Sequence, residues 1–171
     1  RDDPHALPWH VRLRIAREIA SAIEFLHKCK ISHGDLKSMN VLLTSDFISK
    51  ICDFGAAIQR LSTTAIMTSK TDGAATLQYT LHYSAPELLK GAAANTQTDM
   101  YAFGIIMYEL LTCQAPFAGV NAALLRDLIV KEGLRPQVDD AQTSEFPPAF
   151  FDVMKLCWHT DPAMRPTAEN V

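Results

Sequence analysis

The sequence of 171 residues is poor in several features, and each scarcity argues against a class of protein. Its cysteines are few and far apart, and no C-x-x-C pair could begin a zinc site or a redox motif. They are Cys29, Cys52, Cys113 and Cys157. Isolated cysteines of this kind are typical of free thiols in a reducing compartment, and we expect them to be buried.

An excess of charge of one sign is also missing. The chain has 16 Lys and Arg against 19 Asp and Glu, which gives a formal charge of -3. A balance so close to neutral provides no general surface for nucleic acid or for an anionic membrane. We therefore expect no nucleic-acid partner, and any polyanion must be bound locally.

Long apolar runs are absent as well. The most apolar stretch, 100–108, is far shorter than the roughly 20 residues that span a bilayer, and Asp99 and Glu109 flank it. The first ten residues are charged and contain prolines, unlike the apolar part of a signal peptide. We expect no membrane segment in these residues and an intracellular, cytoplasmic location, while attachment through other regions of a longer protein stays open.

The residues that are present predict one globular domain, because 48% are hydrophobic and 20% are charged. Apolar residues recur at helical spacing over 8–27, and further helices are expected over 98–112, 122–131 and 148–158. Two short β-like runs, 41–43 and 49–52, are separated by turn-forming residues and predict a hairpin. The predicted fold class is mainly α with a small β-hairpin.

One region between these elements has no period. Residues 56–80 are rich in Thr, Ser and Ala and are too long for a compact connection. Long segments of this kind are usually functional, so we interpret this one as a regulatory or substrate-facing loop.

The residues with a chemical signature lie around the predicted hairpin. The stretch 33–40 reads HGDLKSMN, so that an aspartate, a lysine and an asparagine precede the first strand, and DFG follows the second strand at 53–55. Phosphoryl transfer needs such groups: a carboxylate that accepts the proton of the attacking hydroxyl, and oxygen ligands for magnesium. With APE at 85–87, the three motifs resemble those of the eukaryotic protein kinase family in sequence and order.

The resemblance implies a role for each motif residue. Asp35 would be the catalytic base, Lys37 would steady the transferring phosphate of ATP, and Asn40 and Asp53 would hold Mg²⁺. Leu42 would lie under the adenine. The family also has a threonine at the position of Thr80, which bonds to the catalytic aspartate and lysine.

Lys37 and Thr80 resemble the residues at these positions in serine/threonine kinases more than those in tyrosine kinases. The implied substrates are therefore ATP and protein Ser/Thr hydroxyls. The stretch 157–166, CWHTDPAMRP, is similar to the C-W-x-x-D-P-x-x-R-P pattern of tyrosine and tyrosine-kinase-like kinases. Together these features indicate the tyrosine-kinase-like serine/threonine group.

Two distant residues complete the resemblance. Asp99 would brace the backbone of the catalytic loop, although its position also allows a helix-capping role. Arg165 would form an ion pair with Glu87. The histidines have no spacing typical of metal ligands, and we expect His27 to have no special role and His33 to serve packing.

The sequence departs from the family at Gly34, where most kinases have an arginine that binds a phosphate on the activation segment. This departure is typical of the non-RD kinases and predicts a different mode of regulation. Tyr79 also replaces a glycine that is common before the position of Thr80.

No G-x-G-x-x-G loop and no V-A-I-K-like strand precede the catalytic loop. We therefore expect residues 1–171 to form only the C-terminal lobe of a kinase domain, truncated near the final helix, with the catalytic loop at 33–40 and the activation segment at 53–87. Such a piece should be inactive without the N-terminal lobe. The alternative is a pseudokinase-like scaffold that binds a partner protein.

Overall fold

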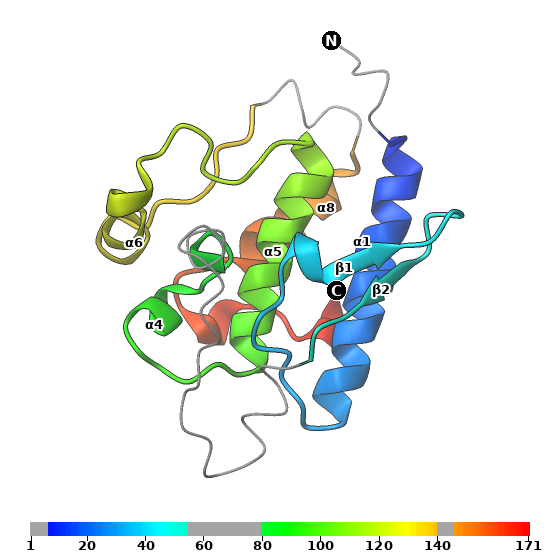
Figure 1. The fold of residues 1–171 in the computed structure, drawn as a ribbon, viewed down its shortest axis with the longest axis horizontal. Coiled ribbons are helices and arrows are strands. Elements are labelled where there is room, and N and C mark those ends of the chain that lie inside the picture. Colours follow the sequence, from blue (N-terminus) through cyan, green and yellow to red (C-terminus); the bar gives the residue numbers. More distant parts are fainter. Residues whose placement is uncertain (1–6, 55–79, 140–145) are drawn as a thin grey trace.

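The computed structural model of the protein describes residues 7–54, 80–139 and 146–171. This part is mainly helical and contains one two-stranded antiparallel sheet, as predicted (Figure 1). Its elements, with 3₁₀ helices written as η, are α1 (Trp9–Lys28), η1 (Ser38–Asn40), β1 (Val41–Leu43), β2 (Ser49–Ile51), α4 (Pro86–Leu89), α5 (Thr96–Thr112), α6 (Ala122–Lys131), α8 (Pro148–Cys157), η2 (Pro162–Met164) and η3 (Ala168–Asn170).

Helix α5 forms the centre of the core, with α1 and α8 packed against it (Figure 1). Most of its residues are buried on every face, as expected for a helix that is apolar all round. It begins two residues before the predicted start because the side chain of Asn95 accepts hydrogen bonds from Gln97 and Thr98 N–H groups. Thr98 in turn accepts from the Asn95 N–H, which completes a capping box.

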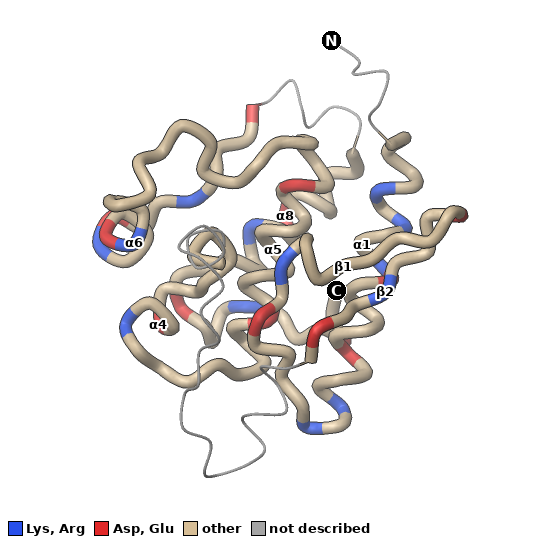
Figure 2. Tube along the Cα trace, viewed as in Figure 1, with Lys and Arg blue, Asp and Glu red and all other residues tan. Residues whose placement is uncertain are grey.

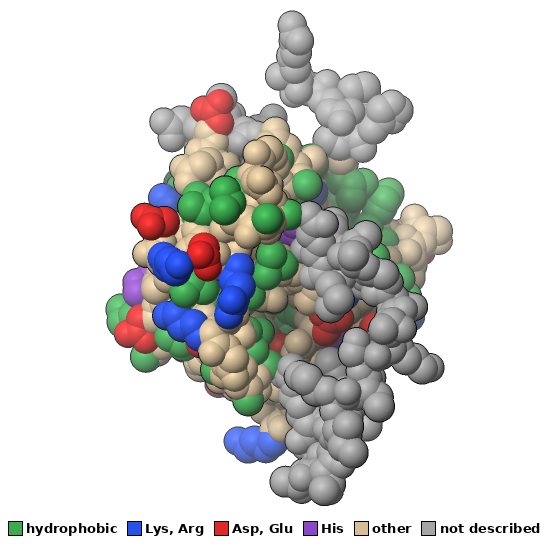
Figure 3. All heavy atoms as spheres, turned by 60° about the vertical axis from the view of Figure 1, so that its left-hand side comes forward, with side chains coloured by type: hydrophobic (Ala, Val, Ile, Leu, Met, Phe, Trp, Pro, Cys, Tyr) green, Lys and Arg blue, Asp and Glu red, His purple; other side chains and the backbone are tan. Residues whose placement is uncertain are grey.

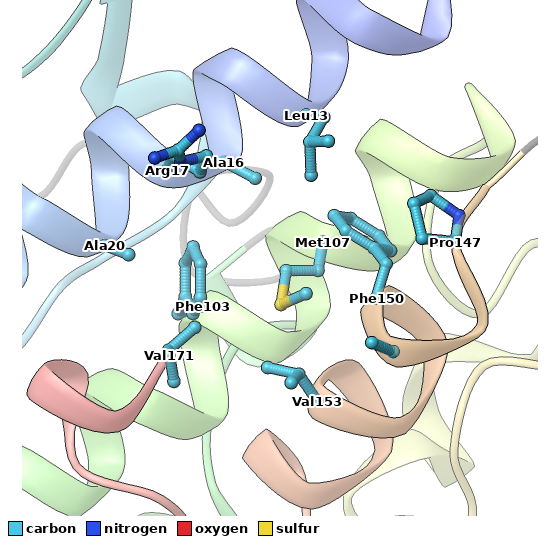
Figure 4. Close-up of a pocket in the computed structure, with 11 residues that line it drawn as sticks. Leu13, Ala16, Arg17, Ala20, Phe103, Met107, Pro147, Phe150, Val153 and Val171 are labelled. Carbon is cyan, nitrogen blue, oxygen red and sulfur yellow. The ribbon is translucent and has the colours of Figure 1, made fainter.

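The helices of the core approach closely where a small residue permits it. A Cβ atom added to Gly104 of α5 would lie 2.9 Å from the Cβ atom of Cys157 in α8, so a larger residue there would push the two helices apart. Met100, Met107 and Met154 fill the same core, as predicted. Among α1, α5 and α8 remains an apolar pocket of about 230 Å³, into which Phe103, Met107 and Val153 point (Figure 4).

The hairpin lies across α1 (Figure 1). Its strands pair Val41 with Ile51 and Leu43 with Ser49. The Glu18 carboxylate of α1 accepts hydrogen bonds from the N–H of Ser49 at 2.7 Å and from its hydroxyl at 2.9 Å. These bonds lower the pKa of Glu18, and they hold the hairpin in one position on the helix.

The cysteine prediction is only partly confirmed. All four thiols are free, but Cys29 and Cys113 are exposed and only Cys157 is buried. Both exposed thiols lie just beyond the last residue of a helix, Cys29 after α1 and Cys113 after α5, where the chain reaches the surface. No helix in the described ranges is long and apolar enough to cross a membrane.

The predicted loop over 56–80 falls almost wholly outside the described residues, and only Thr80 of it is described. Tyr79 and the glycine of the DFG motif also lie outside the described residues.

Figure 2 shows acidic positions along the loop that precedes β1 and just after β2. Figure 3 shows basic and acidic side chains interspersed with hydrophobic ones on the face that carries α4 and α6.

Candidate active site

The loop before the hairpin is held by a buried carboxylate from α5. Asp99 is 2% exposed, and its two oxygens accept the backbone N–H groups of His33 at 2.8 Å and Gly34 at 2.9 Å. Asp99 lies in the first turn of α5, where the helix dipole favours a negative charge. The predicted brace is therefore present, and the capping alternative is wrong because Asn95 caps the helix.

His27 contacts the same carboxylate, and this contact was not predicted from the sequence. Its Nε2 atom lies 3.0 Å from Asp99 Oδ2, so the imidazole donates to the carboxylate that holds the loop. Nothing in its spacing to other histidines or acids pointed to this contact. The only available signal was its place in the last turn of a predicted helix that leads into the loop.

His33 has a fixed tautomer. Its Nδ1 atom accepts the N–H of Asp35 at 3.3 Å, so the ring proton lies on Nε2, which donates to the carbonyl of Cys52 at 3.0 Å. The ring is fully buried and lies 5.2 Å from the ring of Phe54, centroid to centroid. His33 thus joins the loop to the chain after β2 by packing, which agrees with the prediction.

Three predicted catalytic residues meet at the next turn. Lys37 Nζ donates to Asp35 Oδ2 at 2.8 Å and to the hydroxyl of Thr80 at 3.2 Å. The lysine side chain is 7% exposed and that of Asp35 is 24% exposed. Lys37 is therefore a sequestered cation, whereas Asp35 keeps contact with the solvent. No described residue donates to its second oxygen, Oδ1.

The two predicted magnesium ligands are placed differently. Asn40 is buried, and its Nδ2 donates to the carbonyl of Asp35 at 2.7 Å, which leaves its Oδ1 without a donor among the described residues. Asp53 is exposed, has a left-handed φ of 63° and makes no hydrogen bond or ion pair within the described ranges. An amide oxygen and a free carboxylate are hard oxygen ligands, so this pair fits Mg²⁺, which retains several waters.

The bonding around Asn40 connects the two sides of the hairpin. The carbonyl of Asn40 accepts the N–H of Cys52 at 2.9 Å, so the residue before β1 is tied to the residue after β2. Asp53 follows directly, which explains how two ligands 13 positions apart reach one edge of the hairpin. Leu42, the predicted adenine contact, is 56% exposed on β1.

Gly34 has a φ of 79°, in the left-handed region where a side chain is strained. A glycine adopts this backbone conformation without strain, and its N–H reaches Asp99. The backbone just before Asp35 is thus anchored to α5.

A second carboxylate of α5 contacts the other end of the loop. Glu109 Oε1 accepts from the hydroxyls of Tyr83 at 2.7 Å and Ser38 at 3.3 Å, and those two hydroxyls lie 2.9 Å apart. Burial raises the pKa of Glu109, and its Oε2 is buried without a hydrogen-bond partner in the described part of the chain. No motif of the sequence contains all three residues, so this cluster was not predicted.

The predicted ion pair between Arg165 and Glu87 is confirmed. The guanidinium donates to both carboxylate oxygens, at 2.6 and 2.9 Å, and it is fully buried. It also lies 5.2 Å from the centroid of the Tyr101 ring of α5. The pair fixes α4, which follows Thr80, to the C-terminal part of the chain.

Comparisons with known proteins agree with this geometry. Residues 5–171 match the model of the protein kinase domain, and the chain belongs to this family. A serine/threonine-protein kinase/receptor of Acanthamoeba polyphaga mimivirus is 33% identical over 163 residues, 94% of this chain. A LIM domain-containing serine/threonine-protein kinase of Dictyostelium discoideum is 32% identical over 170 residues, 99% of this chain.

A third relative, the serine/threonine-protein kinase SIS8 of Arabidopsis thaliana, is 32% identical over 162 residues, 94% of this chain. The aligned part is only 10% of the viral protein, 24% of the Dictyostelium protein and 15% of the Arabidopsis protein. The chain thus spans a small part of the relatives that it matches.

Proposed function

We propose that the chain is the catalytic C-terminal lobe of a serine/threonine protein kinase, which transfers the γ-phosphoryl group of ATP to a protein hydroxyl. The observation that carries the proposal is the contact of Lys37 Nζ with both Asp35 and Thr80, at 2.8 and 3.2 Å. The relatives are named serine/threonine kinases, which supports the same activity.

In this proposal the two oxygens of Asp35 have different tasks. Oδ2 is occupied by Lys37, whereas Oδ1 has no donor among the described residues. Oδ1 would therefore accept the proton of the attacking hydroxyl, and the bond to Lys37 keeps the carboxylate oriented. Asn40 fixes the same residue from the backbone side by donating to its carbonyl.

When bound, ATP with Mg²⁺ supplies the phosphoryl group and neutralises much of the phosphate charge. Asn40 Oδ1 and the Asp53 carboxylate are the groups of this chain that would hold the metal, and Lys37 would contact the transferring phosphate. Leu42, exposed on β1, would supply apolar contact for the adenine.

The proposal also includes an N-terminal lobe, the kinase group, the mode of regulation and the location. Leu42 and Leu43 on β1, together with Phe47 and Ile48 in the hairpin turn, expose large apolar side chains, which supports an N-terminal lobe that covers this surface in the longer protein. The CWHTDPAMRP stretch supports the tyrosine-kinase-like group, and Gly34 supports a non-RD mode of regulation. Free cysteines are compatible with an intracellular location.

The test is magnesium-dependent transfer from labelled ATP to casein by the full-length protein that contains this chain. Asp35→Asn should lower turnover by about 10²- to 10⁴-fold, the usual contribution of a general base, and leave ATP affinity nearly unchanged. Asp53→Asn should weaken binding of the Mg–ATP complex as well.

Asp46→Asn is the matched control, because Asp46 is exposed in the hairpin turn and its carboxylate has no described partner. If Asp35→Asn retained the turnover of Asp46→Asn, the assignment of Asp35 would be wrong. If the folded wild-type protein transferred no phosphate to any of several protein substrates, the pseudokinase-like scaffold would replace the enzyme.

A further inference from the structure

A pocket of about 470 Å³ lies between the segment that follows α6 and the end of α8. It shares no lining residue with the catalytic loop. Basic and apolar side chains combine in its lining: Arg135, Lys155, His159, Phe151, Trp158 and Val138. None of the described residues that line it is acidic, although the whole chain carries a formal charge of -3.

Arg135 is a half-buried cation that forms no ion pair with a carboxylate of the described residues. Its guanidinium donates to the carbonyls of Trp158 at 2.8 Å and Leu134 at 2.8 Å, and to the hydroxyl of Thr160 at 3.1 Å. Those bonds use three of its five N–H groups. Burial is the main cause that lowers the pKa of Arg135, and the negative charge of Glu87, which raises this pKa, is already paired with Arg165.

A comparison with Arg165, which lies nearby, shows that Arg135 lacks a carboxylate partner among the described residues. Arg135 and Arg165 lie 5.1 and 5.2 Å from the centroid of the same Tyr101 ring. Arg165 is neutralised by both oxygens of Glu87, whereas no described carboxylate pairs with Arg135. A desolvated charge of this kind is costly unless an anion completes it.

Two further donors line the pocket. Lys155 is exposed, makes no ion pair with the described residues, and its Nζ lies 4.1 Å from the centroid of the Phe151 ring. His159 is exposed, and its Nδ1 lies 3.1 Å from the nitrogen and 3.2 Å from the carbonyl oxygen of Asp161, whereas its Nε2 makes no hydrogen bond with the described residues. The side chain of Asp161 is engaged with the N–H of Ala163 and does not line the pocket.

We propose that this pocket binds an acidic peptide segment of a partner protein. Its carboxylates pair with Arg135, Lys155 and His159, and an apolar side chain between them packs on Phe151 and Trp158. A small inorganic anion would satisfy the charges but would leave the apolar lining in water, so the volume and the lining favour a peptide. The inference does not depend on phosphoryl transfer.

The probe is a synthetic peptide, acetyl-Glu-Glu-Phe-Glu-Glu-amide, titrated into the protein in Trp9→Phe background. The chain contains two tryptophans, Trp9 and Trp158, so the emission of Trp158 in the pocket then reports binding. The peptide should change this emission saturably, whereas acetyl-Gln-Gln-Phe-Gln-Gln-amide should not. Added salt should weaken the binding.

Lys155→Glu should weaken the peptide by about fivefold to tenfold, because it replaces an attraction with a repulsion. Lys90→Glu is the matched control, since Lys90 is also exposed and lies outside the pocket, and the substitution changes the net charge by the same amount. Arg135→Lys should give an intermediate loss, because it keeps the charge but removes the planar fork of donors.

Several results would overturn the proposal. Equal binding of the glutamine peptide would show that charge is not recognised, and equal losses with Lys155→Glu and Lys90→Glu would show a general field effect. The same emission change with inorganic phosphate at equal concentration would show a small-anion site. No binding by the folded protein at millimolar peptide would remove the site altogether.

Discussion

Helix α5 contacts the loop that precedes β1 with two carboxylates, and the two carboxylates differ in how completely their oxygens are hydrogen-bonded. At the first turn, Asp99 accepts from His33, Gly34 and His27, so both of its oxygens are used. Near the last turn, Glu109 accepts two hydroxyls on one oxygen, while the other oxygen is buried without a described partner.

The difference separates two uses of a buried acid. Backbone N–H groups in a packed loop are fixed in place and have no access to water as an alternative acceptor. Asp99, with both oxygens bonded, therefore acts as a structural anchor for the residues before Asp35. Glu109 contacts rotatable hydroxyls and gains a proton easily, as its raised pKa indicates. The loop is therefore held firmly ahead of Asp35 and adjustably after Lys37.

The largest expected effect is that of Asp99→Ala. It leaves the buried N–H group of His33 and the half-buried N–H group of Gly34 without acceptors, and each orphaned group costs about 1 to 3 kcal/mol, so we expect a loss of about 3 to 5 kcal/mol in the free energy of unfolding. Urea denaturation measures it. Asp127→Ala in α6 removes an exposed carboxylate that pairs with Lys131 and should change stability far less. Equal losses would mean that Asp99 is not an anchor.

His27→Ala should come next, with a loss of about 1 to 3 kcal/mol, because it removes one donor from a buried carboxylate. His27→Gln should recover much of the loss, since the amide can still donate. In the full-length protein His27→Ala should lower kcat more than it raises KM for ATP, as expected for a residue that positions the loop. A purely structural role would leave kcat per folded molecule unchanged, which would contradict this prediction.

Ser38→Ala tests the contact of the loop with Glu109. It should lower the free energy of unfolding by about 0.5 to 1.5 kcal/mol, the usual range for one hydroxyl hydrogen bond. Tyr83 can still donate to Glu109 in the variant, so the cluster is weakened rather than broken. Ser21→Ala on the exposed face of α1 is the control and should stay within about 0.5 kcal/mol of the wild type. A loss as large as that of Asp99→Ala would remove the distinction between the two ends.

The contact of Asp99 with the loop could be predicted from the sequence, whereas the contact of Glu109 with Ser38 and Tyr83 could not. Arg165 belongs to a motif and Asp99 begins a predicted apolar helix, so the contacts of Asp99 with the loop and of Arg165 with Glu87 followed from resemblance. Helix α6 matched its predicted bounds because its apolar period is clean and Asn121 caps it. The short α4 has no period to detect and was not predicted.

Ser38, Tyr83 and Glu109 meet only because α5 packs behind the loop, and no local pattern encodes a contact between positions 71 residues apart. His27 escaped notice for the same reason, since its partner lies 72 residues away. The exposure of Cys29 and Cys113 depends on where helices end at the surface, which composition does not determine.

The smallest effect is expected for Glu109→Gln, and it has a diagnostic pH dependence. Burial raises the pKa of Glu109 in the folded protein, so the folded state holds this proton more tightly than the unfolded chain. Between the unfolded and the folded pKa the contribution of Glu109 to stability therefore falls as pH rises, and it returns as pH falls.

Glutamine keeps an acceptor for Tyr83 and Ser38 but cannot ionise. At neutral pH Glu109→Gln should match the wild type or exceed its stability by less than about 1 kcal/mol, and the difference should shift toward the wild type as pH falls towards 5. Urea unfolding of both proteins across this range measures the trend, because all other titrating groups are shared. A difference that is constant with pH would show that Glu109 does not titrate there, and the two ends of the loop would then be held alike.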